Sequence, residues 1–327
     1  MKRVKVYITV DAEEDSWHQY VRQNCFVKNI EALSMLQNIF DRYNAIPTYL
    51  MTYPVVTNDI SYDVIYNLFT SNRCDIGMHC HPWNTPPFND GDLIPNDIMS
   101  SENHNNIYDK LETLFKEIQN RFYCKPLSFR AGRWKLNSCV SRAIHELGLR
   151  IDTSVTPFVS WMDDKGPDFF DAPILPYLFN PDDVLIPKSR GVLLEIPVTI
   201  GFFQKNFNIC AKIRRWVANS SLSNWHILGI LDRIGLMNLC WLSPELSDSK
   251  SMLRLARTFV KNGASCLNLS FHSTSLLPGI NPFVKNEEDL KEFLGRIESF
   301  IQYAHESRFE FAPLSMAIEH HAGDLGI

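Results

Sequence analysis

CDIGMHCHPW, residues 74–83, is the stretch that decides the fold. A short apolar segment leads directly into His79, Cys80 and His81 and then stops at Pro82. In a strand successive side chains point to opposite faces, so His79 and His81 would lie on the same face. Two imidazoles at the carboxyl end of a strand can serve as a pair of metal ligands. Two unrelated histidines near a loop would give the same pattern, so the rest of the chain has to decide.

The same pattern, an apolar segment that ends in polar residues, recurs along the chain. The alternating apolar residues of 4–10 predict a first strand, which runs into the acidic cluster at 11–15. Strands and amphipathic helices then alternate, which is typical of parallel β/α units. We therefore expect an α/β fold, a distorted (β/α) barrel of about seven parallel strands that forms one domain over residues 1–327. The expected strands are 4–10, 46–52, 73–81, 127–130, 149–153, 192–198, 266–271 and 309–311, and the expected helices are 30–43, 60–69, 107–118, 138–147, 254–260 and 288–304.

Two segments depart from this alternation. Residues 155–183 contain many prolines and aromatic residues and show little periodicity. Residues 200–248 contain apolar clusters such as WHILGILDRIGLMNLCWL, which is too short and too interrupted to span a bilayer. We interpret 200–248 as a helical insertion packed on the barrel that shapes a pocket. A membrane-surface helix or a partner-binding helix is the alternative.

Composition excludes several classes of protein. The 327 residues are 45% hydrophobic and 21% charged, with a net charge of −5, as in an ordinary globular protein. The one dense basic cluster, Lys212, Arg214 and Arg215, is too short to indicate nucleic-acid binding. The eight cysteines form no Cys-x-x-Cys pair, which favours reduced thiols and a cytoplasmic location. The N-terminal segment lacks the apolar core of a signal peptide, and we expect no integral membrane segment.

Ionisable and aromatic residues gather at the ends of the expected strands, and in a parallel barrel these ends meet at one mouth. A carboxylate with two imidazoles leaves room for water on a zinc-type ion, as in catalytic sites. A second carboxylate can act as general base, and a separate histidine can protonate a leaving group. Metal-assisted hydrolysis is the chemistry that these residue types suit. The residues concerned are Asp11 with Glu13, His79 with His81, Arg130 with Trp134, Asp152, and His272.

Each signal alone has an ordinary structural explanation. An Asp-x-Glu turn is often only solvated acid, and Arg130 could pair with a surface carboxylate. Trp134 could be a core or rim aromatic residue, and His272 could be a histidine near the core. The order of the motifs is the specific part.

That order resembles the polysaccharide deacetylase family, carbohydrate esterase family 4. The resembling motifs are spread over most of the chain, although the insertion at 200–248 and the tail after Ala312 are not covered. They are TVDAE at 9–13, IGMHCHPW at 76–83, FRAGRW at 129–134, IDTS at 151–154 and LSFHS at 269–273.

The resemblance implies a role for each matching residue. Asp11 would be the catalytic base, oriented by Arg130, and His272 would be the general acid, kept protonated by a hydrogen bond that it donates to Asp152. A metal-bound water would attack an N-acetyl carbonyl and release acetate and an amino sugar. One divalent ion, zinc or another transition metal, would be held by Glu13, His79 and His81. Apart from the resemblance, the flat rings of Trp83 and Trp134 suit stacking on a sugar, and core packing is the alternative explanation for them.

Two departures from the family pattern leave alternatives open. The family usually spaces its metal histidines four residues apart, whereas here they are two apart, with Cys80 expected on the other face; His104 is the alternative ligand. The Asp-x-Glu motif also leaves open whether Asp11 or Glu13 binds the metal. We expect a carbohydrate N-deacetylase acting on a surface polysaccharide or glycolipid precursor. The alternatives are a hydrolase of non-sugar amides and a metal-free barrel that only binds glycan or a partner; the oligomeric state is not predicted.

Overall fold

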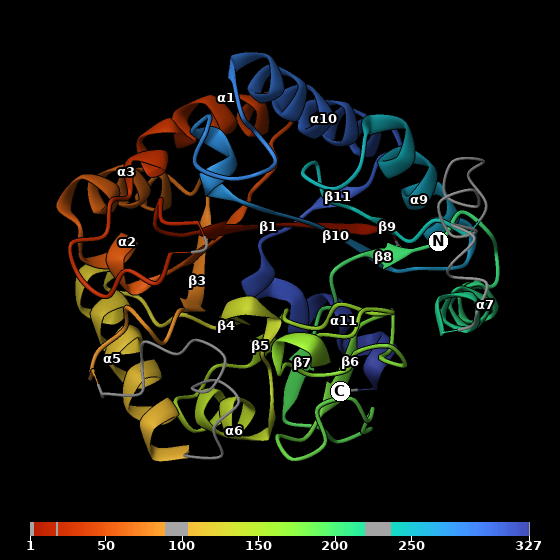
Figure 1. Ribbon diagram of the computed structural model, residues 1–327, viewed down its shortest axis with the longest axis horizontal. Coiled ribbons are helices and arrows are strands. Elements are labelled where there is room, and N and C mark those ends of the chain that lie inside the picture. The colour runs from red at the N-terminus through yellow and green to blue at the C-terminus, as the bar shows by residue number, and fades with distance from the viewer. Residues whose placement is uncertain (1–2, 18, 89–103, 220–236, 327) are drawn as a thin grey trace.

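The computed structural model describes residues 3–17, 19–88, 104–219 and 237–326 (Figure 1). Its centre is a nine-stranded sheet in the order β10-β1-β2-β3-β4-β5-β7-β6, with β11 pairing with β1. The pairs are parallel except for β6 with β7. The strands are β1 (Lys5–Ala12), β2 (Thr48–Met51), β3 (Asp75–Cys80), β4 (Ser128–Ala131), β5 (Ile151–Asp152), β6 (Tyr177–Phe179), β7 (Leu193–Glu195), β10 (Cys266–His272) and β11 (Glu310–Phe311).

The sheet curls into a distorted barrel, as predicted, with seven parallel strands from β10 to β7. Single backbone hydrogen bonds bridge the space between β7 and β10. Thr199 N donates to Asn268 O over 3.4 Å, Leu242 N to Thr199 O over 2.8 Å, and Ser270 N to Leu242 O over 3.1 Å. The barrel is therefore closed by irregular chain that follows β7 and precedes α9 (Ser249–Lys261).

Helices surround the sheet and bury the outward faces of its strands (Figure 1). In β1, Val6, Ile8 and Val10 belong to the large apolar core shared with the helices, whereas Tyr7 belongs to a second cluster inside the barrel. This division follows from the alternation of side chains along a strand. The remaining helices are α1 (Leu33–Arg42), α2 (Tyr53–Thr57), α3 (Asp59–Thr70), α5 (His104–Phe122), α6 (Ser138–Glu146), α7 (Phe207–Asn219), α10 (Glu287–Glu306) and α11 (Ala317–Leu325).

The chain after Ala312 closes the barrel at the amino ends of the strands. Leu314 N donates to Thr48 Oγ1 at the start of β2, and Ser315 N donates to Asp75 Oδ2 at the start of β3. Helix α11 packs on the interior cluster through Ile318 and Leu325. A ligand can therefore reach the barrel interior from the opposite end, where the strands finish.

The structure corrects the sequence analysis in the two irregular segments. Residues 155–183 contain β6, which was not predicted because only three residues pair with β7. The insertion at 200–248 is not wholly helical: besides α7 it contains β8 (Ile200–Gly201) and β9 (Cys240–Trp241), which pair with each other, and residues 220–236 lie outside the described residues. All eight cysteines are free thiols. Among the described residues, no helix has the length and apolar character needed to span a membrane.

Candidate active site

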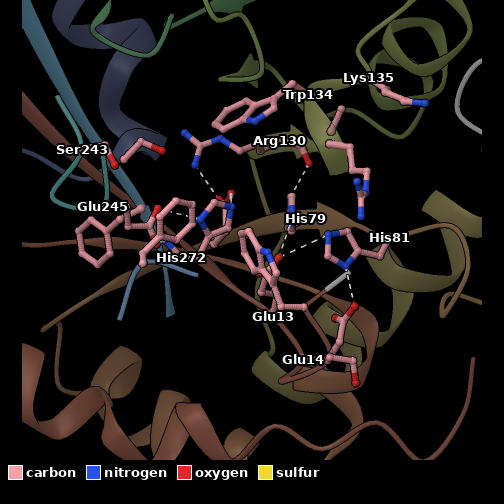
Figure 2. Close-up of a pocket in the computed structure, with 18 of the residues that line it drawn as sticks. Glu13, Glu14, His79, His81, Arg130, Trp134, Lys135, Ser243, Glu245 and His272 are labelled. Carbon is pink, nitrogen blue, oxygen red and sulfur yellow. Dashed lines mark hydrogen bonds and ion pairs between the residues drawn. The ribbon is translucent and has the colours of Figure 1, made fainter. Parts of the chain in front are cut away.

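A pocket opens where β1, β3, β4 and β10 end (Figure 2). It contains eight of the nine residues singled out from the sequence, and Asp152 is the exception. The insertion also contributes to the wall, as expected, through Trp241, Ser243, Glu245 and Leu246.

Glu13, His79 and His81 form a three-residue group whose ligand atoms all lie within 4.8 Å of one another. Glu13 Oε2 is 3.8 Å from His79 Nε2 and 3.5 Å from His81 Nε2. The two imidazole rings face the same side of the strand, with centroids 4.6 Å apart. The intervening Cys80 points elsewhere, because its Sγ lies 3.8 Å from Thr85 Oγ1. His104 is held in another place on α5, 3.2 Å from Glu146.

The donor set fits a divalent transition metal. Nδ1 of His79 lies 3.0 Å from the Arg130 carbonyl oxygen, and Nδ1 of His81 lies 2.8 Å from Glu14 Oε1. Each Nδ1 therefore carries the proton and donates it, which leaves the Nε2 lone pair toward Glu13. Outer partners of this kind are what orient histidines in metal sites. Burial lowers the pKa of His79, which also favours the neutral ring.

Glu14 was not singled out from the sequence. It is buried, and its hydrogen bond to His81 determines the orientation of that ring. Burial opposes ionisation of Glu14, but the interaction with His81, including the hydrogen bond from its Nδ1, holds the pKa of the carboxyl below its usual value. The only indication of Glu14 in the sequence was its position inside the acidic cluster 11–15. The cluster is not a solvated turn, because Asp15 also accepts bonds from Lys28 N at 2.9 Å and Asn29 N at 3.1 Å.

Asp11 and Arg130 form a fully buried ion pair beside the three-residue group. Arg130 Nη1 donates to Asp11 Oδ1 over 2.6 Å, and Nη2 donates to Thr9 Oγ1 over 2.7 Å. Nε donates to the Thr153 carbonyl over 2.9 Å, so the guanidinium is fixed on three sides. Burial favours the neutral acid, yet the Arg130 charge holds the pKa of Asp11 below its usual value. Asp11 is therefore an oriented carboxylate with Oδ2 turned toward His272 Nε2, 3.7 Å away.

The net shift is opposite for Glu13, which has no arginine partner among the described residues. Burial raises the pKa of Glu13 to about 7, although the nearby His272 and His81 partly offset the effect. The surroundings of Asp11 thus favour its ionised form, whereas those of Glu13, two residues later, favour its neutral form. A cation between Glu13 and the imidazoles would restore the charged form of Glu13.

His272 is held by Glu245 and not by Asp152, so the predicted Asp152–His272 hydrogen bond is wrong. His272 Nδ1 lies 2.9 Å from Glu245 Oε2, and His272 N donates to Glu245 Oε1 over 3.0 Å. Burial alone would lower the pKa of His272, but Glu245 and then Glu13 raise it to about 10. The pairing with Glu245 therefore favours the protonated ring of His272 at neutral pH.

Asp152 fails to reach His272 because of the register of its strand. It lies opposite Glu195 in the β5–β7 pair, and its oxygens accept from Ser154 N at 2.8 Å and Ser154 Oγ at 2.9 Å. Burial raises the pKa of both acids, so this pair retains a proton that one carboxyl can donate to the other. The pair supports the barrel wall below the pocket.

Aromatic rings cover the ionisable groups. Trp83 stacks on His81 with ring centroids 4.2 Å apart, and the Arg130 guanidinium lies 5.0 Å from the Trp134 ring centre. Trp17 meets His272 edge-on with centroids 5.0 Å apart. Trp161 and Trp241 complete the apolar part of the wall. The pocket thus combines charged groups at its base with flat apolar surfaces around them.

Comparisons with known proteins find relatives by structure and not by sequence. No family model and no curated protein matches the chain. A protein assigned as a glycoside hydrolase/deacetylase from Parabacteroides distasonis superposes with a TM-score of 0.63 over 98% of this chain and 72% of its own, at 11% identity. One assigned as a polysaccharide deacetylase from Mycobacterium smegmatis gives a TM-score of 0.56 over 99% and 91%, at 14% identity. The chain has the fold of the polysaccharide deacetylases. An allantoinase shares it, with a TM-score of 0.51 over 98% and 91% at 12% identity.

Proposed function

We propose that this protein is a metal-dependent hydrolase that removes an N-acyl group from a carbohydrate. One observation carries the proposal: the Glu13–His79–His81 group shares a pocket with an oriented carboxylate, Asp11, and a protonated imidazole, His272. Hydrolysis of an unactivated amide needs an electrophile, a base and an acid, and this pocket offers a residue for each. The names of the structural neighbours point to the same chemistry.

Glu13, His79 and His81 would hold one divalent ion, for which zinc suits the nitrogen and oxygen donors best. When bound, such an ion supplies Lewis-acid chemistry, because it polarises a carbonyl oxygen and lowers the pKa of water. Glu14 and the Arg130 carbonyl keep the two imidazoles in the ligating orientation.

The protein's own groups manage the protons. Asp11, ionised and fixed by Arg130, accepts the proton of the attacking water. His272, protonated through its pairing with Glu245, delivers a proton to the departing amine. Without that proton the leaving group would be an amide anion, so a positive His272 accelerates bond cleavage. Asp11 Oδ2 and His272 Nε2 lie 3.7 Å apart, so both groups face the same part of the pocket.

The pocket walls fit a sugar ring. Flat aromatic surfaces such as Trp134 and Trp161 stack against the apolar faces of pyranoses, and Trp83 supports His81. The eight free thiols suit a cytoplasmic enzyme that acts on a carbohydrate intermediate, such as a surface polysaccharide or glycolipid precursor.

A second candidate is a hydrolase of a non-sugar amide. The allantoinase among the structural neighbours favours it, because the same fold carries an activity on a small cyclic amide there. The aromatic walls favour the carbohydrate. A panel that contains N-acetylated sugars and small cyclic and linear amides separates the two.

The decisive experiment measures the metal content of the purified protein with His79→Ala, His81→Ala and the control His104→Ala. We expect about one ion per chain in the wild type and in His104→Ala, and none in the other two variants. Acetate release from N-acetyl sugars should follow the same pattern. A wild type that takes up no supplied metal would refute the proposal. Metal lost only in His79→Ala would mean that His81 is not a ligand.

A further inference from the structure

Arg133 occupies an unusual turn at the edge of the pocket. After β4 the chain enters the turn Gly132–Trp134, where Arg133 has φ 52° and ψ 32° and Trp134 has φ 59°. Left-handed backbone is rare for residues other than glycine, and two in succession at a pocket wall suggest a functional reason. The turn makes Arg133 part of the pocket lining, beside the aromatic wall that supports His81.

The Arg133 guanidinium has no counter-ion among the residues that the structure describes. It lies over the ring of Tyr20, 5.1 Å from the ring centre, and 5.8 Å from the ring centre of Trp83. Within the described part of the chain, no carboxylate lies within ion-pair distance of it. Arg130, three residues earlier, differs, because it is neutralised by Asp11. A guanidinium stacked on aromatic faces leaves its N–H edge available for a planar oxyanion.

Three of the five carboxylates that line the pocket are paired within it, and the other two, Glu13 and Asp164, form no ion pair with Arg133 over the described ranges. Asp11 pairs with Arg130, Glu245 with His272, and Glu14 with His81. An additional cation in such a pocket is therefore available to an anion that arrives from outside. Trp83 connects the two features, because it contacts His81 of the metal group and Arg133. An anion on Arg133 would thus belong to the same small molecule as a group held at the metal.

We propose that Arg133 binds a carboxylate or phosphate of the substrate, so that the substrate is an anionic N-acyl sugar and not a neutral one. This inference rests on the proposed function for the acyl group that is removed. It adds the chemical class of the remainder of the molecule, which is a sugar acid or a sugar phosphate. Arg133 would then determine specificity without taking part in the proton transfers.

The test compares three probes: N-acetylglucosamine, N-acetylglucosamine 1-phosphate and N-acetylmuramic acid. Acetate release gives kcat/KM for each, and the ratio of anionic to neutral probe is the readout. We expect a ratio above one in the wild type. Arg133→Met should lower the ratio roughly 10- to 100-fold, the range for a lost charge-assisted hydrogen-bond pair. Arg133→Lys, which keeps the charge without the planar fork, should fall between, and the exposed Arg190→Met should change nothing.

The results distinguish this inference from the proposed function. An unchanged ratio in Arg133→Met, in a protein that still releases acetate, would show that Arg133 only packs on the rings and would overturn the inference. If the wild type releases acetate from no probe, the proposed function fails. Binding of each anionic probe is then measured by quenching of the fluorescence of the pocket tryptophans, in the wild type and in Arg133→Met. The inference stands only if Arg133→Met binds the anionic probes more weakly than the wild type. The phosphate and carboxylate probes identify which anion is recognised.

Discussion

Replacing Glu245 by glutamine should move the pH at which activity is lost. Glutamine keeps the size of the side chain and an oxygen that can accept from His272 N and from Ser275 Oγ, which lie 3.0 Å and 2.5 Å from Glu245 Oε1. The position of Oε2 becomes an amide NH2, so both the negative charge and the acceptor that pair with His272 Nδ1 are lost. The side chains of Glu245 and His272 are 3% and 20% exposed, so solvent screens the pair weakly.

The size of the effect follows from that charge. Two unit charges about 4 Å apart interact by about 4 kcal/mol at an effective dielectric constant of about 20. At about 1.4 kcal/mol per pKa unit, this equals about 3 units. Glu245 is the main cause that raises the pKa of His272 to about 10, in opposition to the effect of burial. Without the charge of Glu245, the pKa of His272 should fall toward about 7 in Glu245→Gln. A bound cation would lower the pKa in both proteins, so the difference between them is the quantity to compare.

The sign of the change is fixed by the role of His272. A general acid must carry its proton, so kcat/KM is constant below the pKa and falls as pH rises through it. Activity in Glu245→Gln should accordingly disappear at a pH about 3 units lower than in the wild type. The assay is acetate release between pH 5 and 11, with the His272 ring followed by NMR. The exposed Glu292→Gln on α10 is the control. A basic limb that stays in place would refute either the acid role of His272 or its control by Glu245.

Three further substitutions test the other parts of the site. Glu14→Gln should weaken metal binding roughly 10- to 100-fold, because the bond that orients His81 loses its charge; a metal titration measures it. Gly132→Ala should reduce metal uptake in a folded protein, because a Cβ there would lie 2.8 Å from His81 Cδ2; circular dichroism and metal analysis together check this. Arg130→Met should destabilise the fold by about 3–5 kcal/mol at neutral pH, because it leaves the buried charge of Asp11 unpaired; urea unfolding would show it, and an unchanged midpoint would contradict the ion pair.

The parts of the site that could be predicted from sequence lie on long strands. β1 and β10 pair over seven residues, from Lys5 with Cys266 to Asp11 with His272, and the hydrophobic pattern of each strand predicted that its polar end lies at the carboxyl edge of the sheet. His79 lies opposite Arg130 in the same way. In parallel strands the ends meet whatever the details of the loops, which is why four of the functional side chains followed from periodicity.

Glu245 and Asp152 show what periodicity does not determine. Glu245 follows the two-residue strand β9 in a segment without a recognisable pattern, and only the packing of that segment against β10 makes it the partner of His272. Asp152 has the expected place in the sequence, but the pairing of β5 with β7 gives it Glu195 as a neighbour instead. Both outcomes depend on which strand lies beside which, and a single strand carries no information on that.

The two-residue spacing of His79 and His81 is a consequence of the element that carries them. Residues i and i+2 of a strand share a face, so His79 and the first residue beyond β3 present their rings side by side without any change of direction. This arrangement is crowded, because the backbone at Gly132, directly after β4, lies against the His81 ring. Only glycine fits there: a Cβ on Gly132 would lie 2.4 Å from the Cys80 carbonyl oxygen. The histidine pair and Gly132, which comes 51 residues after His81, therefore form one structural unit.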